Sequence, residues 1–68
     1  MRCIIENAGS NYSAYLDGLD GVVTTGRSID EIKVNMAEAI AAYKEANEEL
    51  GFLVPDIKVE ELEFVLAE

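Results

Sequence analysis

The sequence contains no histidine, no tryptophan, one proline and one cysteine. The single cysteine, Cys3, cannot form an internal disulfide, and a zinc site is not expected without histidine. Cys3 lies in an apolar segment with no histidine to activate it, so we expect a buried, unreactive thiol. No apolar run approaches the roughly 18 residues that a membrane-spanning helix needs. These absences point away from disulfide-stabilised, zinc-binding and membrane proteins, and no cofactor is expected.

The chain is also short, and its 68 residues make a single domain, residues 1–68. A chain of this size buries only about 60% of the surface that its unfolded form exposes, so its core is thin. Because disulfides and metals do not support it, we expect a homodimer or a higher homo-oligomer. The lone cysteine, and a start that leads from Met1 directly into a strand-like run, indicate a cytoplasmic protein.

Basic residues are scarce, since five stand against fourteen acidic ones and the net charge is −9. Eight of the acidic residues follow residue 44, where Lys58 is the only basic residue. Nucleic-acid binding depends on Lys and Arg side chains that neutralise phosphates, so we expect no direct binding of nucleic acid. A basic protein is the expected partner. The simpler alternative is that the charge only keeps a small domain soluble.

The first part of the chain is typical of a β-hairpin. Residues 2–6 are mostly apolar and β-branched, and they end at a turn of Asn, Gly and Ser residues. Residues 12–16 alternate between two kinds of side chain, which predicts a second strand with two unlike faces. Tyr12 and Tyr15 therefore point to opposite faces, and we expect Tyr15 to be the exposed one.

A loop and a third strand follow the hairpin. Two glycines surround Leu19, which predicts a loop whose leucine packs back onto the core. Residues 22–25 are all β-branched and predict a third strand that ends at Gly26.

A long helix is predicted from Ser28 to about Leu50. Ser28 and Glu31 have the spacing of a capping box, in which each side chain accepts a hydrogen bond from the other residue's backbone N–H. Gly51 is placed to end the helix in a left-handed conformation, and Pro55 prevents its continuation. One apolar stripe is expected to pack on the sheet: Ile29, Ile32, Met36, Ile40, Tyr43 and Leu50.

The segment of residues 57–67 fits two structures. Leu62, Phe64 and Leu66 alternate as in a strand, while Val59, Leu62 and Leu66 also share a helical face. A strand here is favoured, and an edge strand would pair with a second copy to give a dimer. Otherwise the segment packs only within its own chain. The elements together predict an α+β fold with a small antiparallel sheet of three to four strands and one long helix packed on one face.

Several features follow one another along the chain in a characteristic order: the aromatic strand Tyr12–Tyr15, Leu19 and Gly21 in the loop, Gly26 at the end of a strand, Ser28–Glu31 at the helix start, Ala37–Ile40 within the helix, and "GFLVPD" after it. Their order and spacing, over nearly the whole chain, resemble the HicB antitoxins of bacterial and archaeal toxin–antitoxin pairs. The resemblance implies a partial RNase H-like fold, β-β-β-α-β, without nuclease machinery. It also implies a non-catalytic antitoxin that binds and neutralises HicA, a small basic ribonuclease toxin that depends on a histidine.

Two departures limit what the resemblance implies. The family often has a proline and a cysteine in the loop around Gly21, where this chain has Asp20 and Val22. Many members also carry a DNA-binding domain, whereas no separate DNA-binding domain is recognised in these 68 residues. We therefore do not expect operator binding by this chain alone.

Two other functions are alternatives to the antitoxin hypothesis. One is an orphan structural or regulatory dimerisation module that kept the fold without a toxin partner. The other is a metal-dependent nuclease, which would need converging carboxylates. Its candidates, Glu6, Asp17, Asp20 and Glu38, are interpreted as surface acids because nothing in their spacing requires convergence. The predicted surface for a partner or for self-association comprises Tyr15, Glu45, Glu48, Glu49, Glu61, Glu63 and Phe64.

Overall fold

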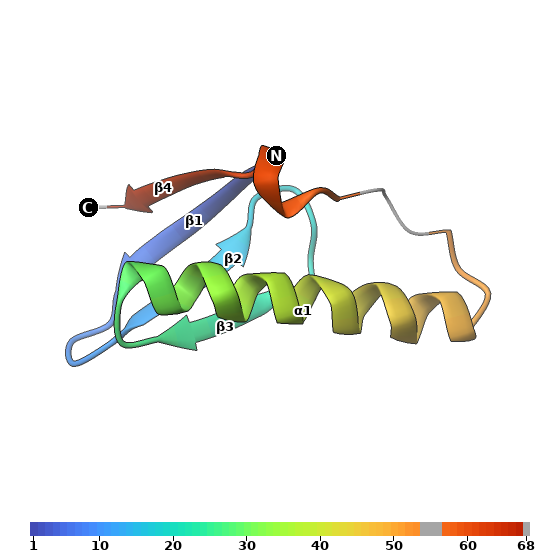
Figure 1. Ribbon diagram of the computed structural model, residues 1–68, viewed down its shortest axis with the longest axis horizontal. Coiled ribbons are helices and arrows are strands. Elements are labelled where there is room, and N and C mark those ends of the chain that lie inside the picture. Colours follow the sequence, from blue (N-terminus) through green and yellow to red (C-terminus); the bar gives the residue numbers. More distant parts are fainter. Residues whose placement is uncertain (54–56, 68) are drawn as a thin grey trace.

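The computed structural model describes residues 1–53 and 57–67, which form one sheet and one long helix (Figure 1). The predicted α+β class and the order β-β-β-α-β are confirmed, with the helix packed on one face of a four-stranded sheet. The elements are β1 (Arg2–Asn7), β2 (Tyr12–Leu16), β3 (Val23–Gly26), α1 (Ile29–Glu49), the 3-10 turn η1 (Val59–Glu61) and β4 (Glu63–Ala67).

The sheet has the order β3-β2-β1-β4. The pairs β1–β2 and β2–β3 are antiparallel, as predicted, but β4 pairs with β1 in parallel, so the sheet is mixed rather than wholly antiparallel. The reason is the helix. After two antiparallel pairings β3 already runs in the direction of β1, and α1 carries the chain back, so the next strand must run parallel to β1.

The C-terminal segment takes parts of both alternatives. Residues Val59–Glu61 form one turn of 3-10 helix, and Glu63–Ala67 form the fourth strand. Leu62 lies between them and is buried in the core. A strand forms here because β1 offers an unpaired edge, and the N–H of Glu63 donates to the carbonyl of Met1 at 3.2 Å.

The helix begins where the sequence predicts. Ser28 is the N-cap, and its Oγ accepts a hydrogen bond from the N–H of Glu31 at 3.1 Å. The return bond of the predicted capping box differs, because Oε1 of Glu31 accepts from the N–H of Arg27 at 3.3 Å instead of that of Ser28. Both bonds satisfy donors that no helical carbonyl reaches.

The helix ends in a Schellman motif around Gly51, which has φ +81°. The N–H of Gly51 donates to the carbonyl of Glu48 at 3.0 Å, and the N–H of Phe52 donates to that of Asn47 at 2.9 Å. A side chain at position 51 would strain this left-handed backbone. The predicted effect of Pro55 lies outside the described residues.

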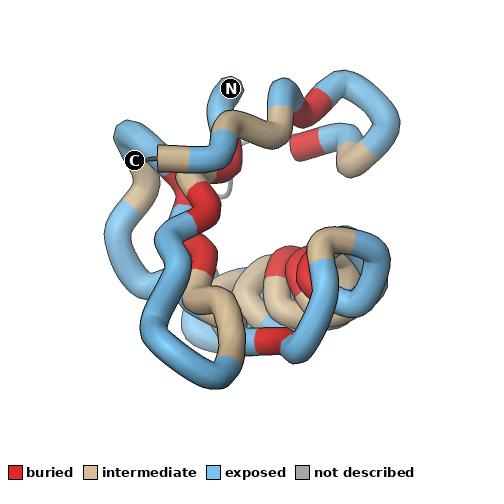
Figure 2. Tube along the Cα trace, turned by 90° about the vertical axis from the view of Figure 1, so that its left-hand side faces the viewer, coloured by how far each residue is buried: buried red, intermediate tan, exposed pale blue. Residues whose placement is uncertain are grey.

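The core lies between α1 and the covered face of the sheet (Figure 2). The helix contacts mainly β3 and β2. Leu19 packs against this core, as predicted for the loop leucine. The buried apolar residues are Cys3, Ile5, Ala14, Leu16, Val22, Ile32, Met36, Ile40, Ile57 and Leu62.

The apolar stripe of the helix is shorter than predicted. Its buried part ends at Ile40, and Tyr43 is only half-buried. Leu50, assigned to the stripe from its spacing, is 71% exposed. The physical reason is length, because 21 helical residues extend over roughly 32 Å, farther than the four to six residues of each strand. The last turns of α1 therefore project beyond the sheet (Figure 1).

Candidate interaction surfaces

The face of the sheet opposite the helix carries an uncovered row of apolar side chains. Cys3 and Ile5 point to the core, so Ile4 between them points to the open face. The strand register places Ile4 opposite both Tyr15 and Val65, and Tyr15 opposite Val23. These four side chains form one row across all four strands, which we call the apolar row. Val23 is 65% exposed and Tyr15 is 39% exposed.

Polar residues border the apolar row. On one side Arg2 lies opposite Glu63 in the register, and its Nη2 is 3.3 Å from Oδ2 of Asp17. This exposed ion pair contributes little to stability. On the other side lie Glu6 and Ser13, which are direct neighbours across β1 and β2. An apolar centre with a polar margin is the usual composition of a protein interface.

A second surface is the helix-end patch, which comprises Glu45, Glu48, Glu49, Leu50, Phe52 and Leu53. Its apolar members project into solvent: Leu50 is 71% exposed, Phe52 is 61% exposed and Leu53 is fully exposed. The last helical turn has no basic residue. The carboxylates of the patch lie at the negative end of the helix dipole, which is unfavourable for negative charge. Glu45 and Glu49 are four residues apart on one face of the helix, so their carboxylates also repel each other. A cationic group bound here would relieve both.

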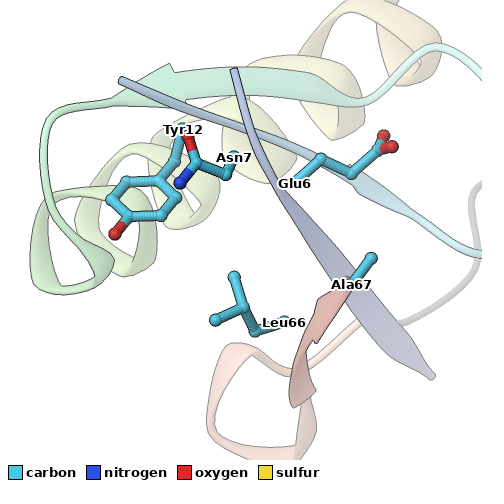
Figure 3. Close-up of a pocket in the computed structure, with 5 residues that line it drawn as sticks. All are labelled: Glu6, Asn7, Tyr12, Leu66 and Ala67. Atoms are coloured by element: carbon cyan, nitrogen blue, oxygen red, sulfur yellow. The ribbon is translucent and has the colours of Figure 1, made fainter. Parts of the chain in front are cut away.

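The third surface lies along β4, where a hollow of about 330 Å³ opens beside Leu66. In Figure 3 the side chains of Tyr12, Asn7 and Leu66 point to one side of the sheet, while Glu6 and Ala67 point to the other. These three side chains lie on the helix side. Leu66 lies opposite the buried Ile5, Asn7 follows Ile5 by two residues in β1, and Tyr12 lies opposite Asn7. The lining combines a carboxylate, an amide, a phenol and two apolar residues from β1, β2 and β4, with no second titratable group beside Glu6 except the phenol, so it suits contacts with another chain more than chemistry.

The structure does not gather the seven predicted site residues into one surface. Three of them form part of the helix-end patch, and Tyr15 and Glu63 lie on the open face of the sheet. Glu61 lies in η1. Phe64 is half-buried on the helix side, where Nζ of Lys33 lies 5.5 Å from the centre of its ring. Their roles in binding stay predictions.

Sequence reasoning missed several residues of these surfaces. Ile4, Val23 and Val65 are far apart in the sequence, and only the strand register places them in one row with Tyr15. The spacing of Leu50 continues the apolar stripe, and its assignment to the core is wrong. The predicted length of the helix, which exceeds what short strands cover, already indicates that its last turns reach beyond the sheet toward a partner or a fourth strand.

The groups considered for chemistry come from several different elements of the structure. Cys3 is fully buried, as predicted, and burial raises the pKa of its thiol above the ordinary value of 9.0. Asp17 is paired with Arg2, and Asp20 is exposed in the same loop after β2. Glu6 is exposed on β1 and Glu38 is exposed on α1. Within residues 1–53 and 57–67 no three Asp, Glu, Cys or His side chains are grouped to hold a metal ion. In the same part of the chain, no helix combines the length and apolarity needed to cross a membrane.

Comparisons of the chain with protein-family models, with curated proteins and with solved structures give no match.

Proposed function

We propose that this chain is a non-catalytic antitoxin that binds and neutralises a small basic ribonuclease toxin in the cytoplasm. The proposal rests on the resemblance to the HicB antitoxins and on the acidic, apolar surfaces described above. The element order β-β-β-α-β, with one helix on one face of the sheet, is the order that the resemblance implies. The lone, buried Cys3 suits a reducing compartment.

The helix-end patch is the observation that carries the proposal. It exposes large apolar side chains, which usually mark a contact with another protein. Its glutamates destabilise the free helix end, so nearby Lys or Arg side chains of a partner would gain more there than at a neutral surface. A basic toxin docked at this end is held by apolar contacts at the centre and by charge at the margin. Its bulk then keeps RNA from the toxin's active site.

The test begins with identification of the partner. The tagged chain is incubated at low salt with a nuclease-treated lysate of the source organism, and small proteins that co-purify are identified by mass spectrometry. We expect a basic protein of well under 100 residues that contains histidine. Expression of that protein alone should degrade RNA and arrest growth in a test host, and co-expression of this chain should restore growth.

A charge reversal separates binding from folding. Glu49→Lys removes an unfavourable charge from the end of α1, so we expect the free protein to be more stable by about 0.3–1 kcal/mol. The same change should weaken the toxin complex and abolish the rescue of growth. Glu38→Lys changes the charge equally in the middle of the same helix and should preserve rescue. Full rescue by Glu49→Lys would contradict docking at the helix-end patch, and the absence of any basic partner would contradict the antitoxin function.

A second candidate function is an orphan structural or regulatory module that acts through self-association. The observation in its favour is β4, which forms an outer edge of the sheet. An unpaired edge strand is a template for pairing with another chain.

A further inference from the structure

The two edges of the sheet differ in how their outward backbone groups are satisfied. At β3, where Val23 and Thr25 face outward, one of the outward groups, the carbonyl of Thr25, accepts a hydrogen bond from Nδ2 of Asn35 on the helix at 2.8 Å. At β4, Glu63 donates its N–H inward to the carbonyl of Met1. Because bonding directions alternate along a strand, Phe64 and Leu66 direct their N–H and C=O groups outward. Within residues 1–53 and 57–67, no backbone hydrogen bond satisfies these outward groups.

These outward groups define one self-complementary register. Suppose that a second copy of β4 lies antiparallel beside the first, with a two-fold axis at Val65. Phe64 then faces Leu66 of the second copy, and the two residues exchange both of their outward hydrogen bonds. The same exchange occurs again on the other side of the axis. Every outward N–H and C=O of Phe64 and Leu66 is satisfied in both copies.

The side chains agree with this register on both faces. On the helix side, Leu66, which is 55% exposed, gains Phe64 of the second copy as an apolar neighbour. At the axis, Val65 faces itself. Glu63, the acidic residue within β4, faces Ala67 of the second copy. The register therefore places no two carboxylates of Glu63–Ala67 directly opposite each other, which would be unfavourable.

The apolar row is continued by the same pairing. Val65 ends the row at the β4 edge, next to Ile4 in the register. With Val65 facing Val65 of the second copy, the two rows join into one uninterrupted apolar stripe across both sheets.

We propose that two copies of this chain pair through β4, antiparallel and centred on Val65, to form one sheet with four strands from each copy. This interface goes beyond toxin binding and gives the second candidate function a defined partner, a second copy. The helix-end patch takes no part in it. The two proposals respond oppositely to salt: screening of the net charge of −9 on each copy strengthens the dimer, whereas it weakens a complex with a basic toxin. Failure of one is therefore distinguishable from failure of the other.

The variant Val65→Cys tests the register. A residue facing its own copy in a non-hydrogen-bonded antiparallel pair has Cα atoms about 4.5 Å apart, within the range of a disulfide. We expect this variant to form a covalent dimer under mild oxidation. The matched control is Val23→Cys at the β3 edge, whose native side chain is more exposed than Val65. Cross-linking of Val23→Cys as fast as Val65→Cys would overturn the proposal.

A second variant tests the hydrogen bonds without a new thiol. Leu66→Pro removes an N–H that points away from β1, so the monomer fold keeps its own bonds. We expect dimerisation, followed by analytical ultracentrifugation at high salt, to weaken by about tenfold or more. Should the proline disturb the fold in circular dichroism, Val65→Glu tests the same interface, because it places two carboxylates opposite each other. A wild-type chain that stays monomeric at high salt and high concentration, or a dimer that persists in these variants, would overturn the proposal.

Discussion

At the scale of single residues, the interior consists entirely of apolar side chains. In the described part of the chain no polar or charged side chain is buried. Ile5, Ile32 and Met36 are the largest side chains that are fully enclosed. Cys3 belongs to the same interior and behaves as a small apolar residue in a strand. Stability therefore depends on packing, and the surface carries all of the charge.

Burial of Cys3 predicts a loss of stability at alkaline pH. The unfolded thiol ionises near 9.0, whereas burial raises the pKa of the folded thiol above this value. The folded state thus favours the neutral thiol. The contribution of the neutral Cys3 thiol to the free energy of unfolding is complete below pH 9.0 and is lost as the pH rises through the folded pKa. Urea unfolding between neutral pH and about pH 10 measures this effect.

The variant Cys3→Ala is the reference for that experiment, because it retains every other group that titrates in the same range. We expect the wild type to lose more stability than the variant as the pH rises. Equal losses in the two proteins would contradict the assignment to Cys3. The native thiol should also react with a thiol reagent only after unfolding.

At the scale of elements, the helix start is fixed by close contact with the sheet. A Cβ atom placed on Gly26 would lie 3.2 Å from the backbone N of Ile32 and 3.3 Å from its side chain. A glycine at the end of β3 therefore lets the first turn of α1 lie directly against the strand. Nδ2 of Asn35 reinforces this contact through its hydrogen bond to the carbonyl of Thr25.

Gly26→Ala is expected to lower the free energy of unfolding by roughly 1–3 kcal/mol, because the added methyl group pushes the helix start away from β3. Chemical denaturation followed by circular dichroism measures the change. Thr25→Ala is the control, since that side chain is exposed and the carbonyl bound by Asn35 remains. Thr25→Ala should lower the free energy of unfolding by less than about 1 kcal/mol. Equal effects of the two substitutions would show that contact with Ile32 does not restrict position 26.

At the scale of the whole molecule, charge acts over the entire length of the protein. The molecule extends 38 × 18 × 18 Å and has a net charge of −9. At low ionic strength the screening length is about 30 Å, so carboxylates at both ends repel each other across the molecule. This repulsion destabilises the compact state.

We therefore expect the melting temperature to rise as sodium chloride increases to a physiological ionic strength, where the screening length is about 8 Å. Thermal unfolding followed by circular dichroism measures it. Glu49→Lys makes the net charge less negative and should show a smaller rise. A melting temperature that does not change with salt, or falls, would mean that long-range repulsion does not limit stability.

Local signals in the sequence are sufficient to predict the order of the elements and the limits of the helix. The cap at Ser28, the left-handed Gly51 and the apolar spacing are local signals, and each acts within a few residues of where it is read. The alternation in β2 likewise predicted that Tyr15 would be exposed. Such features need no knowledge of distant contacts.

The way in which these elements are combined depends on contacts between segments that are distant in the sequence. The parallel direction of β4 follows from the return path of α1, and the apolar row follows from the register of four strands. Leu50 is exposed because the sheet ends before the helix does. Each of these depends on which segments lie beside one another in space, and short sequence patterns do not encode that pairing. For the same reason, the sequence does not predict the hollow beside Leu66 or the outward backbone groups of β4.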